Sequence, residues 1–186
     1  MTIQTHLDAI LQELRHTLER IDPAAAAALI EAIGRAPRIF VAGAGRSGLV
    51  MRGFAMRLMH LGSDAQVVGE TTTPAITAED LLLIGSGSGS TAGPLQSAQT
   101  ASSIGATIAL VTIHRESPIA RLADHVLSIQ APTPKLEQAT GFRSVQPMGS
   151  LFEQSLGLVL DALIMQLMAK TGQDQSAMFG RHANLE

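Results

Sequence analysis

The chain has 186 residues, a length that suits one domain with a sizeable core. It carries a formal net charge of −3 and contains no cysteine, tryptophan or tyrosine, which excludes disulfides and thiolate metal sites and argues against nucleic-acid binding. Although 46% of the residues are hydrophobic, we expect no apolar stretch long enough to cross a membrane, and residues 1–14 contain no apolar signal core. These features predict a cytoplasmic protein whose surplus apolar surface lies between subunits.

The chain begins with two predicted helices. Apolar residues recur at helical spacing over residues 3–21 and predict an amphipathic helix, which could pack on the core or on a partner subunit. The second helix begins at Asp22-Pro23, with Asp22 as N-cap and Pro23 at the first helical position. It ends at Gly34 and Pro37.

Buried strands and helices alternate through the next part of the chain. Continuous apolar runs predict strands over residues 38–42, 65–68, 81–84, 106–112 and 125–129. Helical patterns are expected over residues 49–61 and 91–104, in a short helix that opens at Ser117-Pro118, and from Met148 to near Lys170. Strands that alternate with helices predict a parallel sheet with right-handed crossovers.

The most informative stretch runs from Leu81 to Thr91, where four apolar residues lead into alternating glycine and serine. Glycine lets the backbone turn sharply and brings peptide N–H groups close to a ligand. The hydroxyls and the N-terminus of the following helix favour an anion, most often phosphate. The candidate phosphate-binding residues here are Ser86, Gly87, Ser88 and Thr91. A flexible Gly/Ser linker is the alternative, but linkers rarely lie between a buried strand and an amphipathic helix.

A second glycine-rich turn, Gly43-Ala44-Gly45-Arg46-Ser47-Gly48, follows the first predicted strand. Its glycine spacing matches the dinucleotide-binding fingerprint, in which Glu70 could bind the ribose. Because we expect no second domain to hold a substrate for hydride transfer, a sugar-phosphate site is the favoured interpretation. The candidate residues are Gly45, Arg46, Ser47 and, in a polar loop that could equally be plain surface, Glu70.

The last third of the chain carries one carboxylate on an apolar helix face. It follows a predicted loop over residues 130–147, and loops of this length are usually functional or disordered. Glu153 shares its helix face with Leu156 and Leu160, so it is either a complement to the helix dipole or a buried general base. The pattern alone favours the dipole. Residues 172–186 form a mostly polar tail.

Taken together, these motifs resemble the sugar isomerase (SIS) domain superfamily and, within it, the 6-phospho-3-hexuloisomerases. The Gly/Ser turn indicates only the superfamily, whereas the segments near the C-terminus indicate the isomerases, and the resemblance covers nearly the whole chain. The matching segments are Gly43-Ala44-Gly45-Arg46-Ser47-Gly48, Gly85-Ser86-Gly87-Ser88-Gly89-Ser90-Thr91, Gln146-Pro147-Met148-Gly149-Ser150-Leu151-Phe152-Glu153-Gln154 and Arg181-His182-Ala183-Asn184-Leu185-Glu186. The resemblance implies one SIS domain over residues 1–186, with an N-terminal helical extension and a C-terminal tail. It also implies an α/β fold, a three-layer α-β-α sandwich with a five-stranded parallel sheet of the flavodoxin-like type.

The activity implied by the resemblance is the isomerisation of D-arabino-hex-3-ulose 6-phosphate to D-fructose 6-phosphate through a cis-enediol, in formaldehyde fixation by the ribulose monophosphate pathway. The reaction needs no cofactor or metal, and the histidines of the chain form no ligand cluster. The resemblance makes Glu153 the favoured base and His182 the second acid–base group. It further implies a homo-oligomer, a dimer of dimers with active sites near subunit boundaries.

Two alternatives stay open at this point. One is a non-catalytic phosphosugar-binding SIS module, although the stretch before the first predicted strand is too short for the helix-turn-helix of a regulator together with the packing helices. The other is a different SIS isomerase, acting on sedoheptulose 7-phosphate or arabinose 5-phosphate. A metal requirement would favour the sedoheptulose enzyme, and extra C-terminal domains would favour the arabinose enzyme.

Overall fold

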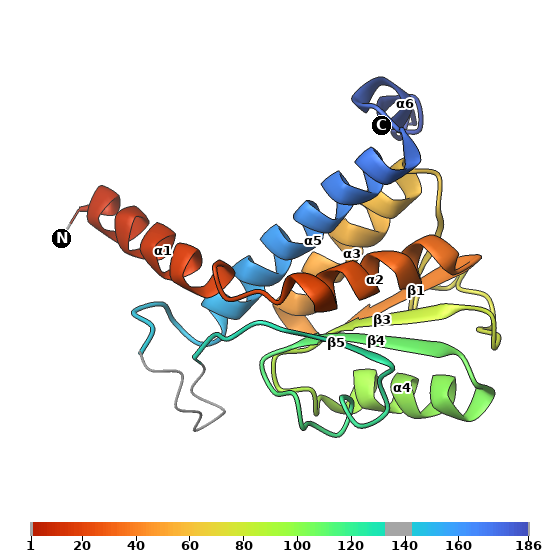
Figure 1. The fold of residues 1–186 in the computed structure, drawn as a ribbon, viewed down its shortest axis with the longest axis horizontal. Coiled ribbons are helices and arrows are strands. Elements are labelled where there is room, and N and C mark those ends of the chain that lie inside the picture. Colours follow the sequence, from red (N-terminus) through yellow and green to blue (C-terminus); the bar gives the residue numbers. More distant parts are fainter. Residues whose placement is uncertain (1, 133–142, 186) are drawn as a thin grey trace.

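The structure, a computed structural model, describes residues 2–132 and 143–185, and it places a parallel sheet between two layers of helices (Figure 1). The strands are β1 (Arg38–Gly43), β2 (Asp64–Val67), β3 (Leu81–Gly85), β4 (Thr107–Thr112) and β5 (His125–Ser128). The helices are α1 (Ile3–Leu18), α2 (Pro23–Arg35), α3 (Gly45–His60), α4 (Ala92–Ile104), α5 (Ser150–Thr171) and α6 (Gln175–Phe179). The predicted α/β sandwich is confirmed.

The five strands pair in parallel in the order β2-β1-β3-β4-β5. The strand order reverses its direction between β1 and β3, and ligands of such sheets bind outside the carboxyl ends of the strands at that point. Every residue of β3 is buried because both faces of the sheet are covered. Figure 1 shows α4 on one face and α2, α3 and α5 on the other, and a separate hydrophobic cluster fills each side.

Local signals set most of the element boundaries. Asp22 caps α2 by accepting a hydrogen bond from the N–H of Ala24 at 2.9 Å, and Pro23 occupies the first helical position. The strands begin and end within a few residues of the predicted limits. The polar tail contains one element that was not predicted, the short helix α6, which Asp174 caps. Part of the predicted loop over residues 130–147 lies outside the described residues.

The predicted short helix at Ser117-Pro118 was wrong. The segment forms a series of turns, in which local backbone bonds such as that from the N–H of Arg121 to the carbonyl of Ser117 accompany one bond to the Gly/Ser turn. The N–H of Ile119 donates to the carbonyl of Gly89 at 3.0 Å, and the buried Ser117 hydroxyl accepts from the N–H of Ala120. The bond to Gly89 and the Ser117 hydroxyl thus pair two N–H groups that a helix would have paired with its own carbonyls.

The expectation that no apolar stretch could cross a membrane also needs correction. By length and composition α5 passes that test, and it is the one helix among the described residues that does. Half of its apolar window is buried inside the domain, as in the core helix of a globular protein. Phe152, Leu156 and Leu160 are among the residues that it buries against the sheet.

An ion pair with a buried carboxylate at the amino end of β3 stabilises the fold. Asp80 is 1% exposed and accepts from Arg38 Nε at 3.0 Å and Nη2 at 2.7 Å. The N–H and hydroxyl of Thr77 donate to the same carboxylate. Burial alone would raise the pKa of Asp80, but the hydrogen bonds from Arg38 and Thr77 outweigh burial and hold that pKa below its usual value.

We therefore expect Asp80→Asn to lower the free energy of unfolding by about 2–3 kcal/mol, since charge-assisted hydrogen bonds to a buried carboxylate are lost. Because the folded pKa is depressed, this contribution is present above the unfolded pKa of about 4 and is lost as the pH falls through the folded pKa. Urea titrations of wild type and variant at pH 7 and pH 3 measure it. Equal stability differences at both pH values would contradict the assignment.

Candidate active site

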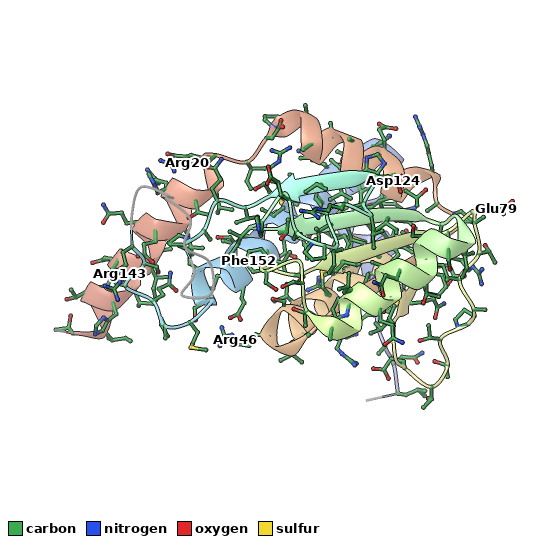
Figure 2. The ribbon with its side chains drawn as sticks, turned by 90° about the horizontal axis from the view of Figure 1, so that it is seen from below. Arg20, Arg46, Glu79, Asp124, Arg143 and Phe152 are labelled. Carbon is green, nitrogen blue, oxygen red and sulfur yellow. The ribbon has the colours of Figure 1, made fainter. Side chains whose placement is uncertain are left out.

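The turns after β1 and β3 and the start of α5 enclose a cavity of about 320 Å³. It lies at the carboxyl ends of the strands, where the strand order reverses. In Figure 2, Arg46 and Phe152 mark this end of the sheet, and Glu79 and Asp124 lie at its opposite end. The cavity brings together most of the residues predicted for the site. These are Gly45, Arg46, Ser47, Ser86, Gly87, Ser88, Thr91 and Glu153.

Three helices begin at this cavity without a side-chain cap. Their N-cap residues are Ala44 of α3, Thr91 of α4 and Gly149 of α5, and all three residues line the cavity. The N-cap side chains of α1, α2 and α6, by contrast, each accept a hydrogen bond from the first turn of the helix. Uncapped N–H groups and the positive ends of three helix dipoles therefore converge on one space, which favours a multiply charged anion there.

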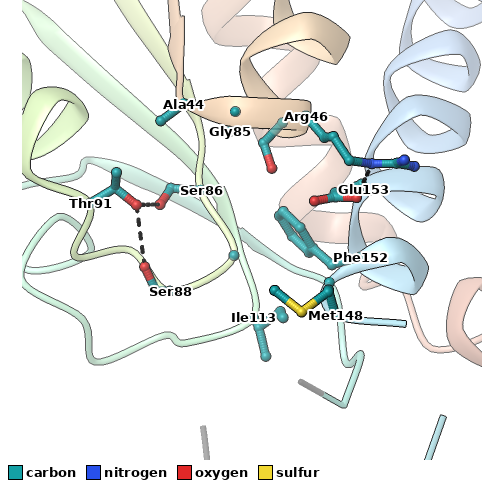
Figure 3. Close-up of a pocket in the computed structure, with 14 residues that line it drawn as sticks. Ala44, Arg46, Gly85, Ser86, Ser88, Thr91, Ile113, Met148, Phe152 and Glu153 are labelled. Atoms are coloured by element: carbon teal, nitrogen blue, oxygen red, sulfur yellow. Dashed lines mark hydrogen bonds and ion pairs between the residues drawn. The ribbon is translucent and has the colours of Figure 1, made fainter. Parts of the chain in front are cut away.

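The Gly/Ser turn supplies hydroxyls to the same space. The carbonyl of Gly87 accepts from the N–H of Ile113 and from the hydroxyl of Thr112, both at 3.1 Å, so the turn is tied to the end of β4. Thr91 Oγ1 lies 3.4 Å from the hydroxyl oxygens of both Ser86 and Ser88 (Figure 3). The three hydroxyls form a compact group of donors, as a phosphate requires.

Gly89 shows why this turn needs glycine. It adopts a φ of +58°, and a Cβ at this position would lie 2.0 Å from the hydroxyl oxygen of Ser117. Any other residue would be strained and would push away the segment that follows β4. The glycine at this position therefore reflects the close approach of the Ser117 side chain to the turn as well as ligand chemistry.

The opposite wall of the cavity carries an ion pair between α3 and α5. Arg46 Nε donates to Glu153 Oε2 at 2.5 Å, and Figure 3 shows the pair across the cavity from the three hydroxyls. The Glu153 side chain is 18% exposed, whereas that of Arg46 is 66% exposed. Because exposed pairs of this kind contribute little stability, a substrate can take Arg46 as its own partner at low cost.

Several residues in the walls of the cavity were not predicted as site residues. Phe152 is only 2% exposed, yet its ring faces the Gly/Ser turn, since a Cβ on Gly87 would lie 3.2 Å from it. Met148 adopts a φ of 56°, which costs free energy for a residue with a side chain. Spacing gave no signal for either role. The cavity residues that were not predicted as site residues are Ala44, Gly85, Ile113, Met148, Gly149 and Phe152.

The SIS domain family matches residues 32–157, a segment that contains every residue of this cavity. The chain belongs to the SIS domain family. It is 45% identical over 187 residues to the 3-hexulose-6-phosphate isomerase of Bacillus subtilis, covering 100% of both chains. It is 47% identical to the enzyme of the same name from Mycobacterium gastri, covering 99% of this chain and 92% of the relative.

A solved structure supports the same relationship. A protein from Methanococcus jannaschii, for which a 3-hexulose-6-phosphate isomerase function was inferred, has a TM-score of 0.85 to this SIS domain. The two chains are 33% identical, and the alignment covers 98% of this chain and 99% of the other. The five-stranded parallel sheet and its flanking helices are thus features of the family.

Two predicted site residues lie outside the cavity of this SIS domain. Glu70 follows the edge strand β2, and its carboxylate forms an ion pair with Arg52 on the exposed side of α3. His182 lies beyond the far end of α5, which begins at the cavity. Because α5 has 22 residues, it is about 33 Å long, so Glu153 and His182 of one chain are far apart.

The C-terminal tail of the SIS domain is nevertheless tied down. The guanidinium of Arg181 donates to the carbonyl of His60 at 3.0 Å and to the side chain of Gln173 at 3.2 Å. The ring of His182 stacks on that of His60 with centroids 5.4 Å apart. Burial, followed by the positive charges of Arg57 and His182, lowers the pKa of His60. The His60 ring gives the His182 ring a platform at the end of α3.

No metal site accompanies this arrangement in the part of the chain that the structure describes. Residues 2–132 and 143–185 contain no group of three or more histidine, cysteine, aspartate or glutamate side chains that could hold an ion. The described lining of the cavity offers hydroxyls, helix N-termini, Arg46 and Glu153.

Proposed function

We propose that this SIS-domain protein is a 3-hexulose-6-phosphate isomerase, which converts D-arabino-hex-3-ulose 6-phosphate into D-fructose 6-phosphate in the ribulose monophosphate pathway. Two relatives with that name match the chain over 100% and 92% of their own lengths. The observation that carries the proposal is the convergence of three uncapped helix N-termini and three hydroxyls beside one carboxylate. The helix N-termini and the hydroxyls suit a phosphate. The carboxylate suits proton transfer on a sugar.

The two walls of the cavity have different proposed roles, phosphate binding on one and proton transfer on the other. Ser47, Ser86, Ser88 and Thr91 hold the phosphate together with the helix N-termini, and the sugar extends toward Arg46 and Glu153. Glu153 removes the proton from C2, the electrons form the C2–C3 double bond of the enediol, and the C3 oxygen gains a proton. Return of the carbon-bound proton to C3 and loss of the C2 hydroxyl proton complete the ketose. Arg46 stabilises the negative charge that develops on the substrate oxygens.

A second acid–base group is needed for the oxygens, and we propose that His182 of a neighbouring subunit supplies it. His182 of the same chain lies at the far end of α5, so it can serve only a different cavity. Exposed apolar side chains on α3 and α5 provide a surface for such a neighbour, since Leu49 and Met56 on α3 and Leu158 and Met165 on α5 recur at helical spacing. We propose a cytoplasmic homo-oligomer with residues 1–186 as a single SIS domain.

A coupled assay tests the activity directly. The protein is supplied with D-arabino-hex-3-ulose 6-phosphate. An added coupling enzyme converts the D-fructose 6-phosphate that forms into the substrate of a dehydrogenase, and the dehydrogenase reaction is followed. We expect turnover with hexulose 6-phosphate and none with sedoheptulose 7-phosphate or arabinose 5-phosphate. Binding of a phosphosugar without any turnover would instead support a non-catalytic SIS module.

Ser88→Ala is expected to raise KM about ten- to a hundredfold with a smaller change in kcat. A hydroxyl hydrogen bond to a charged phosphate is worth about 1.5–3 kcal/mol, and a loss shared by ground and transition states appears in KM. Ser90→Ala is the matched control, because Ser90 belongs to the same turn but does not line the cavity. Equal KM values in both variants would contradict the assignment of the Ser88 hydroxyl to the phosphate site.

A further inference from the structure

Glu13 of α1 binds a segment more than a hundred residues away in the sequence. Its Oε1 accepts from the N–H of Val145 at 2.7 Å, and its Oε2 accepts from the hydroxyl of Ser144 at 2.8 Å and the amide of Gln146 at 2.9 Å. One carboxylate thus receives three hydrogen bonds from three consecutive residues. Charge-assisted bonds of this kind are stronger than neutral ones.

The bound segment leads directly into the wall of the cavity. Pro147 follows it, and the carbonyl of Pro147 accepts from the N–H of Ser150 at 3.1 Å at the start of α5. Between them, Met148 and Gly149 line the cavity, and Met148 adopts its left-handed φ of 56°. A residue with a side chain holds such a conformation only where its surroundings impose it. The bonds to Glu13 restrain the three residues that precede Pro147.

Anchoring α1 itself does not require Glu13. Leu14 and Thr17 are buried on the face of α1 that packs against α5, so the helix is held by its apolar side. Figure 2 shows Arg143, which begins this described stretch, beside α1 and away from the sheet. The Glu13 carboxylate is therefore available to bind the segment after Arg143. Through these bonds α1 is connected to the wall of a cavity that it does not line.

We propose that Glu13 is a positioning residue for the isomerase, which holds residues 144–146 so that Met148 and Gly149 close the substrate cavity. The proposal rests on the proposed function for its kinetic consequence. Glu13 should affect the cavity wall and not the base Glu153. Glu153 lies on α5, which is held in place by Phe152 and Leu156, buried at 2% and 0% exposure. Loss of Glu13 should loosen the wall and leave the base in place.

Glu13→Ala is expected to raise KM about tenfold and to change kcat less than about threefold, because apparent affinity falls with the fraction of molecules whose wall is closed. Glu13→Gln keeps the shape and one acceptor oxygen, so its KM should lie between those of wild type and Glu13→Ala. Gln12→Ala, an exposed neighbour on the same helix, is the matched control. Hydrogen–deuterium exchange of residues 144–150 is measured on all three variants, with faster exchange expected only for the Glu13 changes.

The exchange measurement keeps the proposal testable apart from the activity. If the wild type turns over no hexulose 6-phosphate, the proposed function fails, whereas exchange and the affinity for fructose 6-phosphate still report on Glu13. Should Glu13→Ala fold poorly, Ser144→Ala and Gln146→Ala remove the two side-chain bonds from the other side, leave the bond from the N–H of Val145, and should raise KM in the same direction. Unchanged exchange and unchanged KM in the Glu13 variants, matching Gln12→Ala, would overturn the proposal.

Discussion

Glu153→Gln is expected to lower kcat by about 10²–10⁴-fold, because the amide matches the carboxylate in shape but cannot accept the proton from carbon. KM should change little, since we propose that the Gly/Ser turn and the helix N-termini hold the phosphate. The fold should survive, as a neutral amide is easier to bury than a carboxylate and the Arg46 partner is exposed. Steady-state kinetics in the coupled assay, with circular dichroism on the same samples, measures both expectations.

The control for this change is Glu79→Gln, which alters a carboxylate at the opposite end of the sheet (Figure 2). Its kcat should equal that of the wild type. If Glu153→Gln keeps more than about a tenth of the wild-type kcat, the loss falls below what a general base contributes, and the base must be reassigned. Glu70 would then be the next carboxylate to change, although it lies outside the cavity and pairs with Arg52.

His182→Ala is expected to lower kcat by about 10²-fold or more, as for the loss of an acid–base group on the reacting oxygens. The tail should stay attached through Arg181, which donates to the carbonyl of His60 independently of the imidazole. His6→Ala, which removes an exposed imidazole on α1, is the control and should be silent. Deletion of residues 180–186 should abolish turnover, because it removes both the histidine and its attachment.

Mixed oligomers test whether the site is shared. If Glu153 and His182 come from different subunits of a symmetric dimer, a Glu153→Gln chain paired with a His182→Ala chain contains one intact site. An equal mixture with free exchange should then recover about a quarter of the wild-type activity, because half of the dimers are mixed and each has one of two sites. Mixed dimers that form, as native mass spectrometry shows, and stay inactive would place His182 in its own chain or outside the reaction.

Much of this SIS domain could be predicted from local patterns. Buried parallel strands such as β3 and β4 are continuous apolar runs, and the cap at Asp22-Pro23 is local chemistry. The Gly/Ser turn was assigned to a phosphate site because glycine, hydroxyls and a helix start stand next to one another in the sequence. Eight of the ten predicted site residues line one cavity; seven of them belong to the two glycine-rich turns, and Glu153 was favoured as the base by the family resemblance. Glu70 and His182 do not, because their assignments depended on where distant elements meet.

The sequence by itself determined which segments are strands and helices and which turns can bind an anion, since both depend on residues a few positions apart. Only the tertiary structure decided that three uncapped helices begin at one cavity, that Arg46 pairs with Glu153 and that Glu13 binds residues 144–146. It also turned Ser117-Pro118 from a helix into turns. These outcomes depend on hydrogen bonds and packing between segments far apart in the chain, whose free energies exceed the local preferences that a sequence pattern expresses.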